Sequence, residues 1–370
     1  MRKNKNNETT LPLTISSKDG LVNQITYFNK QVSSKDMSGY YLLKSGEFAY
    51  NKSYSVGYDY GSIKRLERYP MGALSTLYIC FKLTQFDSDF IKVYFDSLKW
   101  YKEIYMIAAE GARNHGLLNV SVEEFFNTKH TLPSNINEQK KISQFLLLLE
   151  KRIEKQQRLV ESLKSYKRGV TEEFYLKNHR SLKLSCIGEY ATICGGYSFK
   201  SSSYVDEGKY KIITISNVTG ERNANTSIGN YINVLPTDIQ DNQILSIDDM
   251  VISLTGNVGR VSLINSDNCL LNQRVAKLTV NCRKYKEYIF QVLSSSDFET
   301  NMINCGQGAA QKNIKNSDIL DYQFLMPIND DLLFNISKVL NFIDDKIIKS
   351  NKQLDLLILQ KQSFLQQLFI

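Results

Sequence analysis

The stretch that decides the fold is LPSNINEQKKISQFLLLLEKRIEKQQRLVESLKSYKRGV, residues 132–170. A similar stretch occurs later in the same chain, MPINDDLLFNISKVLNFIDDKIIKSNKQLDLLILQKQSF, residues 326–364. A shift of 194 residues aligns the two without a gap and places Pro133 on Pro327 and Lys167 on Lys361. Two copies indicate a duplication rather than a solenoid, which needs at least three repeats. We therefore predict two similar halves, each a globular domain followed by a helix.

Each copy carries a heptad stripe of mostly apolar residues. In the first copy the two seam positions hold Leu146, Ile153, Val160, Lys167 and Phe174, and Ile142, Leu149, Gln156, Leu163 and Val170. In the second copy they hold Leu340, Ile347, Leu354, Lys361 and Leu368, and Ile336, Ile343, Ser350, Leu357 and Phe364. Such a pattern over more than four heptads is typical of a coiled coil. We expect helices of about 50 Å, with Asn135, Asp330 and Asp331 as N-terminal caps.

Polar residues interrupt both seams at matching places, first at Gln156 and Ser350, then at Lys167 and Lys361. Polar seam residues cost stability but restrict register. Two separate chains could dimerise through either helix. An intramolecular antiparallel pair is favoured, because tethering raises the effective concentration. In that pair we expect each lysine to lie level with the opposite glutamine or serine, so that the helices form a ruler of fixed length.

The length of 370 residues predicts two to three domains. We predict a mixed α/β (α+β) fold, because short alternating runs such as Tyr210–Ser216 and Leu74–Leu83 are typical of strands. Further strands are expected over Gly46–Tyr54, Asp249–Gly256, Arg260–Ile264 and Arg274–Val280, and helices over Asp87–Lys99 and Tyr285–Leu293. The expected domains are globular regions at 1–132 and 181–326, followed by the helical regions 133–180 and 327–370.

Composition excludes several classes of protein. Hydrophobic residues at 42% and charged residues at 23% are ordinary globular values. The first residues, MRKNKNNETT, lack the apolar stretch of a signal peptide, so we expect a soluble, cytoplasmic protein. The cysteines are scattered and only three histidines are present, so we expect no zinc site, disulfide scaffold or cofactor. The cysteines are Cys80, Cys186, Cys194, Cys269, Cys282 and Cys305.

A search for catalytic motifs finds no phosphate-binding loop, no zinc-protease motif and no nucleophile elbow. His115 has no carboxylate neighbour to orient it, and Glu207-Gly208-Lys209 is too short a match to a nuclease motif. The chain is therefore expected not to be an enzyme. Its net charge of +8 is compatible with a polyanionic partner but does not require one.

Polar residues on the expected loops are more informative, because Lys, Arg, Asn, Gln and hydroxyl groups contact phosphates and base edges. Ordinary exposed loops are the alternative, but such segments recur in both halves. We expect the first half to contact DNA through Lys52, Tyr54, Lys64, Arg65 and Arg113. For the second half we expect Lys200, Thr255, Asn257, Arg260, Gln273, Arg274 and Lys312.

Several motifs in order resemble one family. They are GEFAYNKSYSVGYDYGSIKR (46–65), DDMVISLTGNVGRVSLI (248–264), and GQGAAQKNI (306–314) followed by MPIND. Across the whole chain they are similar to the specificity subunit of type I restriction–modification systems. The resemblance implies a subunit without a catalytic centre, whose two target-recognition domains each read half of a bipartite site in double-stranded DNA. It also implies an antiparallel coiled coil as spacer, two adenine-methylating subunits, and motor-nuclease subunits.

The first half departs from the second at its beginning. Segment 181–204, SLKLSCIGEYATICGGYSFKSSSY, has no counterpart there, although LPLTISSKDGLVNQITYF (11–28) resembles a strand–turn start. Two other functions compete with DNA recognition. One is a coiled-coil adaptor whose globular domains bind protein, and the other is a self-contained nuclease. Steep weakening of binding with salt distinguishes phosphate-dominated DNA recognition from the adaptor.

Overall fold

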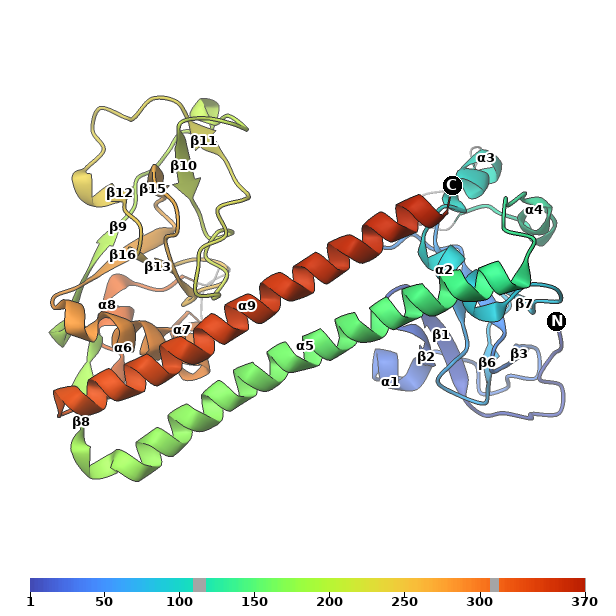
Figure 1. Ribbon diagram of the computed structural model, residues 1–370, viewed down its shortest axis with the longest axis horizontal. Helices are drawn as coiled ribbons and strands as arrows, with labels where there is room; N and C mark the ends of the chain where they lie inside the picture. The colour runs from blue at the N-terminus through green and yellow to red at the C-terminus, as the bar shows by residue number, and fades with distance from the viewer. Residues whose placement is uncertain (109–117, 307–312, 370) are drawn as a thin grey trace. The chain divides into compact units, whose positions relative to one another are not determined.

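The computed structural model describes residues 1–108, 118–306 and 313–369. The chain divides into two compact units, Met1–Gln157 with Gln353–Ile370, and Arg158–Lys352. Two long helices, α5 (Ile136–Asn178) and α9 (Asp330–Leu368), each contribute to both units (Figure 1). The predicted mixed α/β fold, with a long helix between sheet-containing domains, is confirmed.

Both long helices begin three residues after their proline. α5 has 43 residues and α9 has 39, which makes them about 65 and about 58 Å long, longer than expected. Asn135 Oδ1 accepts a hydrogen bond from the Asn137 amide at 2.8 Å, as its predicted capping role requires. In α9 the corresponding acceptor is Asn329, which binds the Asp331 amide at 2.7 Å. The acids predicted as caps instead lie in the first turn, where they favour the helix dipole.

The first unit contains a four-stranded sheet and a three-stranded sheet. Their orders are β2-β1-β6-β3 and β5-β4-β7, with β1 and β6 parallel and the other pairs antiparallel. The strands are β1 (Pro12–Ser16), β2 (Gly20–Asn23), β3 (Tyr41–Lys44), β4 (Phe48–Asn51), β5 (Ser62–Arg65), β6 (Met71–Leu74) and β7 (Ile79–Phe81). The short helices are α1 (Gln24–Phe28), α2 (Ser88–Asp96), α3 (Tyr101–Ala108) and α4 (Val122–Asn127).

The second unit repeats this arrangement and adds to it. Its sheets have the orders β11-β10-β15-β12, β14-β13-β16-β9 and β17-β8. The strands are β8 (Leu182–Cys186), β9 (Ala191–Gly195), β10 (Tyr210–Ile213), β11 (Tyr231–Ile232), β12 (Ile244–Leu245), β13 (Met250–Ser253), β14 (Val261–Leu263), β15 (Cys269–Leu271), β16 (Val275–Val280) and β17 (Gln323–Pro327). The short α-helices are α6 (Arg283–Leu293), α7 (Ser296–Cys305) and α8 (Asn316–Leu320).

The two units share one sheet topology. β10 and β15 are the parallel pair of the second unit, as β1 and β6 are of the first. β13 lies between β14 and β16, as β4 lies between β5 and β7. The duplication seen in the helices therefore extends to the sheets. Among the described residues, strands equivalent to β8 and β9 are present in the second unit only, and both lie within segment 181–204, which is the segment the first half was predicted to lack.

Most expected strands and helices are present in shortened form. The run Leu74–Leu83 is not a single strand, because a turn in which the Tyr78 amide binds the Ser75 carbonyl separates β6 from β7. The predicted strand–turn start at 11–28 is confirmed as β1, β2 and α1.

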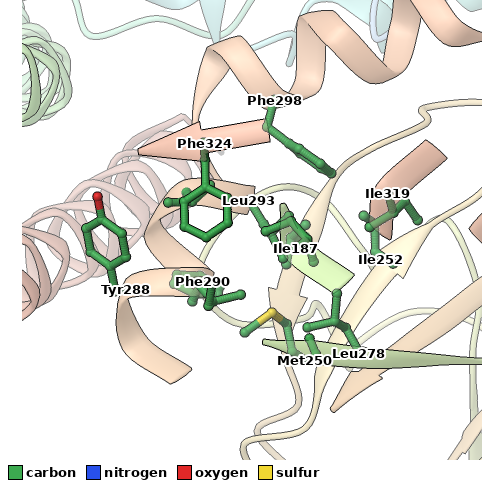
Figure 2. Packing of buried hydrophobic residues seen from close by; sticks show 14 of the residues in the cluster. Ile187, Met250, Ile252, Leu278, Tyr288, Phe290, Leu293, Phe298, Ile319 and Phe324 are labelled. Carbon is green, nitrogen blue, oxygen red and sulfur yellow. The ribbon is translucent and has the colours of Figure 1, made fainter. Parts of the chain in front are cut away.

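Each unit has its own core. In the second unit, Met250, Ile252 and Leu278 from the sheet pack against Phe290 and Phe298 of the helices (Figure 2). One of the buried clusters of the first unit is rich in aromatic residues. It contains Phe48, Tyr50, Phe81, Phe95, Trp100 and Phe125, all buried.

Within each unit, segments of α5 and α9 pack side by side. In the first unit Leu149 and Ile153 form a cluster with Leu357, and the rings of Phe145 and Phe364 lie 4.9 Å apart. As residue numbers rise along α5, the numbers of the contacting residues on α9 fall. The predicted antiparallel pairing is therefore confirmed in this unit. In the second unit Leu163, Val170 and Phe174 pack on the core that contains Ile336, Ile343 and Ile347.

The seam lysines bind carboxylates rather than the expected glutamine and serine. Lys167 Nζ lies 2.6 Å from Asp344 Oδ1 in the second unit. Lys361 Nζ lies 2.9 Å from Glu150 Oε1 in the first unit. Glu150 and Asp344 are related by the same shift of 194 residues as the lysines. The prediction of lysine level with amide or hydroxyl was wrong, because each carboxylate sits one position beyond the seam and reaches across it.

Candidate nucleic-acid interface

Three segments of the second unit meet beyond the carboxyl ends of β9, β13 and β15, and we call this place the edge of the second unit. They are the chain after β9, the turn between β15 and β16, and the loop between β13 and β14. The Gln273 amide binds the Tyr197 carbonyl at 2.9 Å, and the Leu254 amide binds the Arg274 carbonyl at 2.9 Å. The Ile314 amide adds a fourth segment by binding the Leu254 carbonyl at 3.0 Å. These backbone hydrogen bonds join positions that are 76, 20 and 60 residues apart in the sequence.

Local chemistry fixes these loops. A Cβ on Gly196 would lie 2.2 Å from the Asn272 carbonyl oxygen, so only glycine permits this close approach. The Asn272 side chain accepts a hydrogen bond from the Arg274 amide at 3.1 Å, which shapes the turn. Ser253 Oγ closes the β13–β14 loop, because it donates to the Asn257 carbonyl and accepts from the Arg260 amide. The exposed side chains therefore stand on a rigid base.

The donors predicted in the second half gather on this base. Lys200, Asn257, Gln273 and Arg274 are exposed, and Thr255 is half-buried. The side chains of Lys200, Gln273 and Arg274 have no hydrogen-bond or ionic partner among residues 1–108, 118–306 and 313–369. They are free to bind an anion or a base edge.

Arg260 is only partly available. Its Nε donates to Glu299 Oε1 at 3.2 Å, and the side chain is about one third exposed. It therefore joins the β13–β14 loop to α7, and a phosphate would compete with the glutamate for it.

Tyr197 belongs to the same edge but was not among the predicted contacts. Its hydroxyl donates to Asp238 Oδ1 at 2.7 Å, and this hydrogen bond raises the pKa of Tyr197. Its ring lies 4.9 Å from that of Phe199, at an angle. The signal was present in the segment GGYSFK, where a tyrosine directly follows the glycine pair.

In the first unit the corresponding loop between β4 and β5 is held by Lys52. Its Nζ donates to the Val120 carbonyl at 3.1 Å, and its own carbonyl accepts from the Leu118 amide. Tyr54 stands beyond it with 58% of its surface exposed. Lys52 therefore positions the loop, whereas Tyr54 is open to a ligand.

The structure places Lys64 and Arg65 in ion pairs on α2. Lys64 Nζ lies 2.7 Å from Asp96, and Arg65 lies 2.7 Å from Asp89. Arg65 also pairs with Glu67 at 2.6 Å. Burial opposes the charge of Arg65, but the hydrogen bonds to Glu67 and Asp89 outweigh it, so that the pKa is raised. Two further predicted contacts, Arg113 and Lys312, lie outside the described residues.

None of the described histidine, cysteine and acidic residues form a group of three that could hold a metal ion. Within the same described residues, no helix is both long and apolar enough to cross a membrane.

Residues 181–360 match the family described as type I restriction modification DNA specificity domain. The match includes every loop of the edge described above. Residues 181–360 therefore form a domain of the type I restriction modification DNA specificity family. This match supports a non-catalytic role in DNA sequence recognition, and the protein-binding adaptor is not favoured. No curated protein matches the sequence.

Solved structures share the fold of this chain. The crystal structure of a type I restriction–modification S subunit from M. genitalium is similar with a TM-score of 0.59 and 15% identity, over 92% of this chain and 87% of that one. A chain from a structure on complex assembly and conformational transition of the type I system has a TM-score of 0.50 and 14% identity, over 100% and 93%. At these identities the likeness shows a shared fold.

Proposed function

We propose that this chain is a specificity subunit that reads a bipartite DNA site, with one half-site for each globular region. The recognition regions are 1–132 and 181–326, and the helical regions are 133–180 and 327–370. The observation that carries the proposal is the edge of the second unit, where Lys200, Gln273 and Arg274 stand exposed without protein partners on backbone-linked loops. The shared topology of the two units supports a second reader in the first.

Within this interface we assign different roles to different side chains. Lys200 contacts phosphate, and Gln273 and Arg274 contact base edges in the major groove, where both residue types form paired hydrogen bonds. Thr255, Asn257, Arg260 and Lys312 complete the second half-site contacts. Tyr54, Lys52 and Arg113 serve the first half-site. Lys64 and Arg65 would have to leave their carboxylate partners to bind phosphates, so we expect them to contribute least to DNA binding.

The partners we propose are double-stranded DNA, two adenine-methylating subunits and, through the assembly, motor-nuclease subunits in the cytoplasm. Exposed apolar side chains on the long helices support protein partners, since contiguous apolar surface marks interaction sites. They include Leu148, Leu356 and Leu359 in the first unit, and Phe334 and Phe342 in the second.

The experiment is DNA binding by the chain together with its methylating subunit, on DNA whose methylated adenines have first been mapped. Arg274→Ala and Gln273→Ala should each cost about 1–3 kcal/mol of discrimination at one base pair of one half-site. Lys200→Ala should weaken all sequences alike and reduce the salt dependence. Lys183→Ala, which removes an exposed lysine of β8 outside this edge, is the matched control. Unchanged affinity and site preference across all three variants would refute the interface.

We further propose that the paired long helices set the spacer between the half-sites. Seven residues inserted after Gln157 and seven more after Lys352 should lengthen the spacer by about three base pairs, since a heptad adds about 10 Å and a base pair occupies about 3.4 Å. An insertion into only one helix should damage folding. A spacer that stays the same after matched insertions would contradict the ruler.

A further inference from the structure

The first unit carries a groove that the DNA-reading role does not use. β7 is the edge of its three-stranded sheet. A cavity of about 500 Å³ follows this edge between the sheet, the N-terminal residues and α4. Its apolar wall is formed by Tyr41, Ile79, Cys80, Phe81, Val122 and Phe126.

In the second unit the equivalent position is filled by a strand. β9 pairs with β16, the counterpart of β7, over five residues from Ala276↔Gly195 to Val280↔Ala191. The strand is preceded by Ile187, which is fully buried in the core next to Leu320 of α8. A Cβ on Gly188 would touch Leu320 at 3.5 Å, so the backbone there lies directly on α8. The second unit thus shows what this kind of groove accepts.

α4 and α8 are related by the shift of 194 residues, which places Phe126 on Leu320. Leu320 is half-buried beneath the chain that leads into β9. Phe126 is 55% exposed and Val122 54% exposed, because no such strand covers them among the described residues of the first unit. Two large apolar side chains next to an unpaired sheet edge are the elements that strand addition requires.

Residues 2–4 do not pair with β7. The Leu42 amide binds the Arg2 carbonyl and the Asn4 amide binds the Tyr40 carbonyl, so residues 2–4 run along β3 instead of β7. Lys82 is exposed at the rim and has no partner among the described residues, whereas Arg2 is paired with Glu47 at 2.8 Å. An acidic residue in the incoming segment would find a cation there.

We propose that the β7 edge and the exposed face of α4 form an acceptor site for an extended strand donated by another polypeptide. The donor segment resembles β9 and the residues before it. It has one apolar residue that packs on Phe126, alternating apolar side chains along the strand, and an acidic residue that pairs with Lys82. Main-chain hydrogen bonds to residues 79–81 supply affinity, and the apolar contacts fix the register. A second copy of this chain is a poor donor, because its β9 is already paired with β16. The site does not depend on DNA reading.

The test uses the full chain and a synthetic peptide of residues 181–204 under reducing conditions. We expect one peptide bound per chain and at least tenfold slower amide hydrogen exchange across residues 79–81, with no change across 275–280. Val122→Lys and Phe126→Lys should each weaken binding at least tenfold. Val234→Lys, which alters an exposed valine of the second unit, is the matched control. A peptide with Ile193→Pro should not bind, because proline cannot extend the sheet.

Several results would overturn the site. They are no binding, binding that is equal in Val122→Lys and Val234→Lys, or slower exchange only at residues 275–280. Self-association of the chain that Val122→Lys abolishes would assign the groove to a second copy and would also reject a foreign donor. Circular dichroism of each variant separates lost binding from lost folding.

Discussion

Both units fasten their globular part to the long helices through a network of partly or fully buried charges, but the short helix, α2 or α6, contributes a charge of opposite sign in each. The pair of seam lysine and carboxylate is the same in each, Lys361 with Glu150 and Lys167 with Asp344. Aligning α2 and α6 from their first residues places Lys92 on Glu287.

In the first unit Lys92 lies 3.5 Å from both Glu150 and Asp96. In the second, Glu287 holds Arg222 in a two-pronged pair at 2.7 and 2.8 Å, and Arg222 reaches Asp344 at 3.5 Å. Gln291 completes this network with a hydrogen bond of 2.7 Å to Asp344.

The helix pair thus supplies the same ion pair in each unit, whereas the sign of the neighbouring charge on the short helix depends on the charges of the globular part. The networks also differ in exposure. The Asp344 side chain is 9% exposed and the Glu150 side chain 33%. A buried charge that loses its partner costs far more than one in contact with water, so the two units should respond unequally to equivalent changes.

The largest expected effect is that of Asp344→Ala. It leaves Lys167, Arg222 and the Gln291 amide without their shared acceptor, and the free energy of unfolding should fall by about 3–5 kcal/mol. The equivalent change in the first unit, Glu150→Ala, should cost about 1 kcal/mol because water reaches that site. Urea denaturation of both variants measures the difference, and equal losses would show that exposure does not govern these networks.

Exchanging the sign at the matched position should have the next largest effect. Glu287→Lys sets a lysine beside Arg222, and Lys92→Glu sets a glutamate beside Asp96 and Glu150. Each should destabilise its own unit by about 2–3 kcal/mol, since like charges are brought together in partly buried surroundings. Hydrogen exchange resolved along the chain locates the loss. A variant as stable as the unsubstituted protein would show that the surrounding charges do not determine whether Lys92 or Glu287 is tolerated at the matched position.

A smaller effect should separate the units in DNA binding. Tyr54→Ala should alter preference in one half-site only and Arg274→Ala in the other, each by about 1–3 kcal/mol or less at a single base pair. Methylation of DNA with one substituted base pair at a time gives the preference of each variant. Both variants acting on the same half-site would break the assignment of one reader to each unit.

The smallest expected effect is on pH dependence. Burial opposes the charge of Glu287, but Arg222 and Gln291 outweigh it and hold its pKa below the ordinary value of 4.5. Lys92 and Lys361 do the same for Glu150. The unfolded state therefore binds these protons first, and stability that is complete above pH about 4.5 is lost as pH falls below it. Glu287→Gln should flatten this acid loss in denaturation curves of the second unit. An unchanged acid profile would assign the loss to other carboxylates.

The sequence predicted the duplication, the long helices and the absence of β8 and β9 from the first half, because these depend on periodicity and alignment. It did not predict the partners of Lys64 and Arg65, since Asp96 and Asp89 lie 32 and 24 residues away and only the packing of α2 on β5 brings them close.

The seam lysines were assigned wrong partners because only the two core heptad positions were considered. Glu150 and Asp344 occupy the next position in both copies, where charged residues commonly pair across a coiled coil. That signal was available in the sequence. Loop composition was enough to predict which side chains at the edge of the second unit could contact DNA. It could not predict that they lie together, because that depends on the backbone hydrogen bonds of Gln273 and Leu254.

The first unit also contains the last part of the chain. Phe369 is buried there, with its ring 5.6 Å from those of Phe90 and Tyr94, and Leu357 packs on Leu149 and Ile153. During translation Leu357 and Phe369 are made about 200 residues after the start of α5, whose apolar side chains Leu357 covers. At roughly 5–20 residues per second the ribosome needs about 10–40 s to supply them. The residues before and within the start of α5 are therefore made well before their partners on α9, and during that interval their apolar seam is exposed to chaperones and proteases.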